Sequence, residues 1–286
     1  MTSHSGHSPR AGLRDQASDT LAAIGASPEM PFDIGEAALA LAALDRPRIP
    51  LEHYRRHLAD LAEAVGHSAR DNIGAEAKAA ALTAVIAGAE GYCGDDETYD
   101  DLQNANLISV IDRRRGLPVA LGIIYLQVAR AQGWQATGLA FPGHFLISID
   151  AGAERVIFDP FAGRPVDSAA TLRAMLKATA GNEAELTPAC YAPLGDRHVL
   201  ARLQNNIKTR LAAQGRFAEA IRISEGMLLI VPEETMLHRD LGIFHAEMGN
   251  LNAAIGALDT FVNLTTDEEA RHIASALAQK IRTRLN

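Results

Sequence analysis

Cysteine is scarce in this sequence of 286 residues, and its scarcity excludes two classes of protein. The two cysteines, Cys93 and Cys190, lie far apart in the chain. Neither has a neighbour at the spacing of a disulfide framework or of a cysteine-rich zinc site, so both kinds of scaffold are excluded. Sparse use of cysteine fits a reducing compartment, and we therefore expect a cytoplasmic protein.

Long hydrophobic runs and an excess of basic residues are also missing. The longest apolar run, residues 119–129, is interrupted by Gln127 and closed by Arg130. It is shorter than the roughly 20 residues that a bilayer requires, so no membrane segment is predicted. The chain has 27 Lys and Arg against 35 Asp and Glu, a net charge of −8. Since proteins that bind phosphate backbones usually carry a basic excess, no nucleic-acid partner is predicted.

The first residues have little that would fold. They are rich in Ser, Gly and His and lack the apolar segment of a signal peptide, so we predict a disordered leader over residues 1–31. The chain as a whole is 48% hydrophobic and 22% charged, which is ordinary for a soluble globular protein. We therefore expect folded structure from residue 32 onward.

The pattern of apolar residues changes twice along the folded part. Three helices are predicted between residues 35 and 91, where apolar residues recur at helical spacing and Pro47 and Pro50 separate the first two helices. An apolar helix over 119–132 follows, with Pro118 at its first position. Short β-like runs then cover 136–140, 145–149 and 156–158, with Gly and Pro between them. Helices followed by antiparallel strands indicate an α+β fold.

The last third of the chain repeats itself. Residues of the same kind recur 34 positions apart, namely Gly215 and Gly249, Phe217 and Leu251, Ala220 and Ala254, and Ile221 and Ile255. This period is typical of tetratricopeptide repeats. We predict an all-α domain over residues 195–286 with two repeats and a capping helix from Asp267 to Leu285. Such repeats form concave surfaces, so we expect a protein or peptide partner there.

Three motifs in the middle of the chain carry a family resemblance. In order they are N-A-N-L-I-S-V-I-D-R-R-R-G-L-P, F-P-G-H-F-L and F-D-P-F. With them the chain resembles the SirB N-terminal family of the transglutaminase-like superfamily, whose members often carry C-terminal tetratricopeptide repeats. The resemblance implies a papain/transglutaminase-like core over residues 32–194 that includes the helical N-terminal layer.

The same resemblance implies a Cys–His–Asp site, but this sequence lacks one part of it. The His matches His144 and the Asp matches Asp159, whereas the Cys position falls at or next to Pro118. Without a thiol or hydroxyl there, the pair can act only as a general base or proton shuttle. We favour a structural pair over a site for ligand or partner recognition, and either of these over catalysis.

Two functions follow from this reading. The favoured one is a non-catalytic protein-interaction or regulatory module that uses its groove and its repeats. The alternative is a hydrolase or transferase of altered chemistry that uses His144 and Asp159 without a cysteine nucleophile. Neither requires a cofactor.

A run of arginines, Arg113 to Arg115, allows two interpretations. It is either a solvated turn with ion pairs to acids such as Asp112 and Asp101, or an anion or acidic-peptide site at the start of the following helix. Because the turn matches the family motif, we keep as candidate binding residues Asn104, Arg113, Arg114, Arg115, Gly116, Pro118 and Gly143.

The remaining candidates are weaker. His53 and His57 have the spacing of a helical metal pair, but Arg55 and Arg56 between them would repel a cation, so no metal site is predicted. Cys93 lies among acidic residues that would raise the pKa of its thiol, and Cys190 is read as a small apolar residue.

Overall fold

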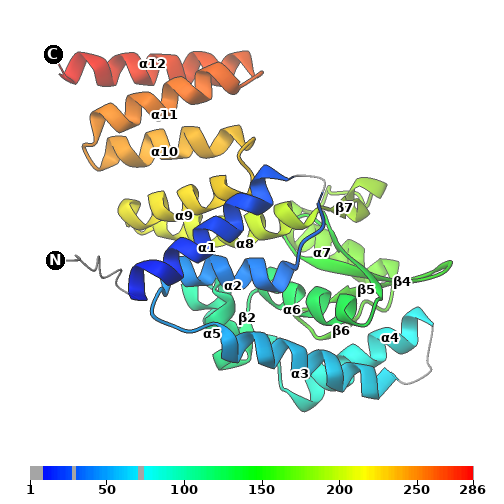
Figure 1. The fold of residues 1–286 in the computed structure, drawn as a ribbon. Helices are drawn as coiled ribbons and strands as arrows, with labels where there is room; N and C mark the ends of the chain where they lie inside the picture. Colours follow the sequence, from blue (N-terminus) through cyan, green and yellow to red (C-terminus); the bar gives the residue numbers. More distant parts are fainter. Residues whose placement is uncertain (1–8, 28–29, 70–73, 286) are drawn as a thin grey trace, which may run out of the picture. The chain divides into compact units, whose positions relative to one another are not determined.

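The computed structural model describes residues 9–27, 30–69 and 74–285 (Figure 1). The chain forms two compact units. The first combines Met1–Ala17 with Pro31–Leu203, and the second combines Ser18–Met30 with Gln204–Asn286. Among the described helices, none is both long enough and apolar enough to cross a membrane.

Three helical segments open the first unit and form the predicted N-terminal layer. They are α2 (Ile34–Asp45), α3 (Glu52–Ala69) and α4 (Ala75–Leu82), and α4 continues directly as a π-helix, η1 (Thr83–Ala89). The side chain of Asp33 caps α2 by accepting a hydrogen bond from the Glu36 N–H at 2.7 Å. Both α2 and α3 contact the central helix α6 (Pro118–Ala131).

Helix α6 is the core of the first unit. All of its residues are buried except Gln127, Arg130 and Ala131. It begins with Pro118 at its first position, where the missing N–H is not needed. The apolar run that the sequence shows over residues 119–129 is thus a helix that is covered on nearly every side.

The sheet of the first unit has the order β6–β5–β4–β3–β7 and is antiparallel throughout. Its strands are β3 (Gln135–Leu139), β4 (Leu146–Ala151), β5 (Glu154–Asp159), β6 (Arg164–Pro165) and β7 (Pro193–Leu194). The ring of Tyr125 on α6 packs against Phe158 of β5, with centroids 4.8 Å apart. Leu139 and Leu146 belong instead to a cluster with Leu172 of helix α7 (Ala169–Ala180). Helices therefore pack on both faces of this antiparallel sheet.

The second unit consists mainly of helices joined by short turns. These helices are α8 (Asp196–Ala213), α9 (Phe217–Ile230), α10 (Thr235–Glu247), α11 (Leu251–Leu264) and α12 (Glu268–Leu285), and α8 begins in the first unit. The two glycines that the repeat period aligns, Gly215 and Gly249, have positive φ angles of 70° and 75° in equivalent turns. Helix α12 packs on α11 through Ala274, Ala278 and Ile281.

The predicted disordered leader is wrong for residues 9–26, which form helix α1 (Pro9–Ala26). Leu21 is fully buried, and Gly25 lies so close to the Leu229 carbonyl that a Cβ there would clash. Ala17, Leu21 and Gly25 are four residues apart, so one face of α1 is small and apolar. Residues 1–8 of the predicted leader lie outside the described residues.

The boundary between the two units also differs from the predicted one. The sequence places it at residue 194, whereas the units divide after Leu203, inside α8. The reason is that the first turns of α8 pack on the sheet, where Val199 fills the space beside Gly138.

Candidate functional site

A short turn in front of α6 holds the family motif. Helix α5 (Leu107–Arg113) is capped by the next residue, Arg114, which takes a left-handed conformation with φ of 59°. Strand β2 (Arg115–Gly116) then pairs with β1 (Cys93–Gly94). Gly116 is required here, because a Cβ would lie 2.9 Å from a methyl group of Val110. The Arg-Gly-Leu-Pro motif therefore sets the path by which the chain enters α6.

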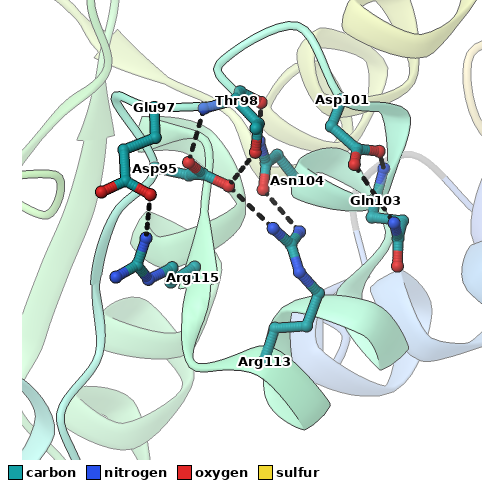
Figure 2. Close-up of polar contacts among 8 residues, drawn as sticks. All are labelled: Asp95, Glu97, Thr98, Asp101, Gln103, Asn104, Arg113 and Arg115. Carbon is teal, nitrogen blue, oxygen red and sulfur yellow. Dashed lines mark hydrogen bonds and ion pairs between the residues drawn. The ribbon is translucent and has the colours of Figure 1, made fainter.

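Asn104 braces this turn from inside (Figure 2). Its Nδ2 donates to the Thr98 carbonyl at 2.6 Å, and its Oδ1 accepts from Arg113 Nη1 at 2.7 Å. The backbone carbonyl of Asn104 accepts the N–H of Leu117 at 2.8 Å. The polar groups of Asn104 are thus occupied by bonds that hold the turn together.

Asp95 is the acidic partner of Arg113 in the same network (Figure 2). The carboxylate lies 2.8 Å from Arg113 Nη2, and its side chain is only 1% exposed. Hydrogen bonds from Thr98 hold the pKa of this carboxyl well below its ordinary value, and Arg113 acts in the same direction against the effect of burial. Asp95 is therefore a buried anion at neutral pH.

The other two arginines of the run also have internal partners. Arg114 donates to Tyr92 Oη at 3.2 Å and lies 3.3 Å from Glu90, while Arg115 lies 3.3 Å from Glu97. The prediction of internal ion pairs is confirmed, but the predicted acids were wrong. Asp112 accepts instead from Tyr54 at 3.1 Å, and Asp101 accepts from the backbone and side chain of Gln103. The predicted acids are nearer in sequence, but the β1–β2 pairing brings the 90–97 segment to the arginines.

His144 and Asp159 meet as the motif order predicts. His144 Nε2 lies 2.9 Å from Asp159 Oδ1, which also accepts the N–H of Phe161 at 2.9 Å. Asp159 is the last residue of β5, whereas His144 lies in the turn before β4 and not on a strand. The two side chains are 17% and 13% exposed. One carboxylate therefore orients both the imidazole and the turn after β5.

Gly143, the residue before this histidine, is needed for the conformation of the backbone. Its φ is 70°, and a Cβ would lie 2.3 Å from the side chain of Thr179. A glycine is the residue that fits such a position. The candidate binding residue Gly143 thus shapes the loop of His144.

No group that could act as a nucleophile occupies the start of α6. Leu117, Pro118 and Val119 are all buried, and their side chains are hydrocarbon. Cys93 is exposed on β1, and Cys190 is buried in the cluster between the sheet and α7. The position that the resemblance assigns to the cysteine is therefore filled with apolar groups.

The histidine pair on α3 does not converge on one point. His57 Nε2 lies 2.8 Å from Tyr92 Oη, and His53 contacts the ring of Tyr54 edge-on. Burial lowers the pKa of His57, and the nearby charge of Arg114 lowers it further. Across residues 9–27, 30–69 and 74–285, no three His, Cys, Asp or Glu side chains are grouped as a metal site would need.

Sequence reasoning missed Arg202, which lies on α8 and holds the His144 loop. Its Nη2 donates to the carbonyl oxygens of Phe141 at 3.1 Å and of His144 at 2.8 Å. Burial of this guanidinium lowers the pKa of Arg202. The available signal was weak, because a single arginine in a helix of mixed composition is common.

Comparison with known proteins agrees with this architecture. The transglutaminase-like superfamily matches over residues 52–205, and a tetratricopeptide repeat family matches over residues 207–282. The crystal structure of menin aligns at 12% identity over 90% of this chain and 73% of that chain, with a TM-score of 0.39, a likeness too low to assign a fold.

Three curated relatives are similar over most of their length. A UPF0162 protein of Xylella fastidiosa is 31% identical over 68% of this chain and 72% of its own. A UPF0162 protein of Vibrio cholerae is 28% identical over 85% and 90%, and protein SirB1 of Salmonella typhimurium is 25% identical over 72% and 74%. The chain therefore belongs to the transglutaminase-like superfamily, as a member of the UPF0162 and SirB1 family that carries tetratricopeptide repeats.

Proposed function

We propose that this protein is a non-catalytic member of its superfamily that binds a protein or peptide partner. The observation that supports the proposal is the start of α6, where three buried hydrocarbon side chains occupy the position that the resemblance assigns to the nucleophile. Acyl transfer through a covalent intermediate needs a thiol or hydroxyl at this point. The His144–Asp159 pair then has a structural use, because it ties the turn before β4 to the end of β5.

The repeats supply the surface for the partner. Met236 and Ile243 are seven residues apart on α10, so they lie on one face of that helix, and they are 38% and 36% exposed. Large apolar side chains that share an exposed face are typical of protein-binding sites. Tetratricopeptide repeats use such helices to bind peptides or helices of other proteins.

The test is a binding experiment with the full-length protein. In an affinity pull-down from a lysate of the source organism, the partners of the unchanged protein are identified first. The double variant Met236→Glu, Ile243→Glu should lose these partners, because charges replace the apolar contacts. Met248→Glu is the matched control. Met248 is 44% exposed and directly follows α10, on another face than Met236 and Ile243. Equal capture by all three proteins would place the binding elsewhere.

A second candidate function is water-mediated hydrolysis by His144 and Asp159. The observation that favours it is that the 2.9 Å pair is not sealed, since the histidine side chain keeps 17% of its surface exposed. A histidine oriented by a carboxylate can act as a general base toward water. Screening against p-nitrophenyl esters tests this function, which requires that any turnover be lost in both His144→Ala and Asp159→Asn.

A further inference from the structure

A large cavity opens beside the outer edge of β5 in the first unit. Its volume is about 1060 Å³, and it lies between α4 with η1 on one side and the start of α7 on the other. Most of the side chains around it are apolar. Neither His144 nor Asp159 lines it. The cavity is therefore separate from the site of the His144–Asp159 pair.

The first part of β5, before Ile157, is left unpaired on the side next to this cavity. The short strand β6 pairs only with Phe158 and Asp159, and beyond it the Val166 N–H donates to the Ile157 carbonyl at 2.8 Å. In an antiparallel strand, the N–H and C=O groups of residues two positions apart point toward the same neighbouring strand. Arg155 lies two positions before Ile157, so its N–H and C=O also point away from β4. In the part of the chain that the structure describes, no backbone group of another segment pairs with them.

The walls of the cavity fit a chain that continues the sheet. Val156 and Ile157 are half-buried on opposite faces of β5, and both line the cavity. On one side of β5, the cavity is lined by Ala80 and Ala84 of the helical layer. These side chains are small, so they leave space for the side chains of a bound peptide. Leu172 lines the cavity from α7. An added strand would thus find apolar surface for the side chains on both of its faces.

The helical wall carries a polar group without a partner. The hydroxyl of Thr83 is buried, and within the described ranges it makes no hydrogen bond, although Thr83 lines the cavity. Thr83 also begins the π-helical turn η1, and such turns occur frequently at functional sites.

The charges around the cavity select the kind of ligand. Glu76 and Asp167 line it from opposite walls, and a hydrogen bond from Thr171 lowers the pKa of Asp167, which keeps this carboxylate charged. Among the described residues of the lining, Arg155 is the cation, and Asp150 binds it at 2.6 Å. Arg164, outside the lining, also lowers the pKa of Asp167, so its charge offsets part of that carboxylate. With two carboxylates against one guanidinium, the lining still carries more negative than positive charge, and basic side chains complement it.

We propose that the free edge of β5 binds an extended peptide of a partner protein, with apolar residues in the cavity and basic residues on either side of them. The peptide adds a strand to the sheet through the backbone of Arg155. This site is distinct from the repeats and from the His144–Asp159 pair, so the inference does not rest on the function proposed above.

The probes for the test are capped, fluorescein-labelled hexapeptides of the form Lys-X-X-X-X-Lys, pooled with X as Val, Ile, Leu or Thr. Their binding to the full-length protein is measured by fluorescence anisotropy. The Lys-flanked pool should bind, the Glu-flanked pool should bind at least about tenfold more weakly, and N-methylated versions should not bind because they cannot form the strand ladder. Hydrogen exchange of the Arg155 amide should slow when the pool is added.

Matched variants locate the site. Ala84→Trp fills the cavity and should weaken binding at least about tenfold, whereas Ala64→Trp, at an exposed position of α3, should leave it unchanged. Glu76→Lys should reverse the preference for Lys over Glu flanks, and Glu63→Lys on the outside of α3 should not. Melting curves of each variant check that the fold is retained.

Three results would overturn the proposal. The first is no binding by any Lys-flanked pool. The second is equal binding of N-methylated probes, which would indicate an apolar ligand pocket without strand pairing. The third is a dimer of the unliganded protein that Ala84→Trp dissociates, which would show that a second copy of this chain occupies the edge.

Discussion

The guanidinium of Arg202 donates a hydrogen bond to the backbone carbonyl of His144 at 2.8 Å, although the two residues are 58 positions apart. The same group bonds the Phe141 carbonyl at 3.1 Å. A side chain on α8 thus fixes both ends of the turn that carries the histidine, while Asp159 fixes the imidazole itself. The loop is held by a cation from outside the family motifs.

Removal of this cation should loosen the loop. We expect Arg202→Met, which keeps the length of the side chain, to lower the free energy of unfolding by about 2 kcal/mol, because two carbonyl groups lose a charged donor. Urea denaturation measures this change. The exposed Arg48 provides a control, since Arg48→Met should change stability by less than about 0.5 kcal/mol. Equal effects of the two variants would contradict the assigned role.

The buried anion Asp95 should be a major source of stability above its pKa. We expect Asp95→Asn to cost about 3 kcal/mol at pH 7, because Arg113 loses its partner. The folded protein holds the pKa of Asp95 below its unfolded value of about 3.9. Its contribution is therefore complete above that value and is lost as the pH falls through the folded pKa.

Two urea titrations check this dependence. The stability difference between Asp95→Asn and the unchanged protein should shrink below about pH 4 and stay constant above it. Asp96→Asn, in the same loop but exposed, should have little effect at any pH. A difference that grows toward low pH would have the wrong sign for this ion pair.

The central helix should be sensitive to loss of volume. Leu126 on α6 is fully buried, so Leu126→Ala should lower the free energy of unfolding by about 2–5 kcal/mol through the cavity that it leaves. Leu264→Ala is the control, because Leu264 is 49% exposed. Thermal and urea unfolding of both variants measure the contrast, and a small effect at Leu126 would mean that α6 is not the core.

A thiol placed at the start of α6 tests the alignment with the cysteine enzymes. In Pro118→Cys the alignment predicts a thiol at a helix N-terminus that faces the imidazole of His144. Both groups favour the thiolate, so we expect the pKa of the new thiol to fall below about 8.5. Alkylation rates measured against pH give the value, and Cys93→Ser removes the exposed background cysteine. An unshifted or raised pKa would mean that the lost nucleophile aligns elsewhere or that the groove has closed.

The contrast between what could and could not be predicted follows sequence distance. The His144–Asp159 pair was predictable because one hairpin, turning at Gly152, brings the two residues together. Arg202 was not, since nothing local indicates which loop a distant arginine will hold. The acids that pair with the arginine run were misassigned for the same reason, because the β1–β2 pairing that brings them together spans 22 positions.

Weak local signals explain the other differences. Strands β6 and β7 have two residues each and contain proline, so no alternating pattern marks them. Helix α1 was missed because the polar first eight residues were taken together with it, and its apolar face around Leu21 is small. By contrast, α6 and the repeats were predictable, since long apolar runs and a fixed 34-residue period are strong signals.

The absence of amide chemistry is the central claim, and one assay tests it most directly. Ammonia release and amine incorporation are measured with a glutamine-containing peptide, full-length protein and His144→Ala. We predict the same background rate for both proteins, because no nucleophile stands at the start of α6. Turnover above background by the unchanged protein, abolished in His144→Ala, would contradict the account.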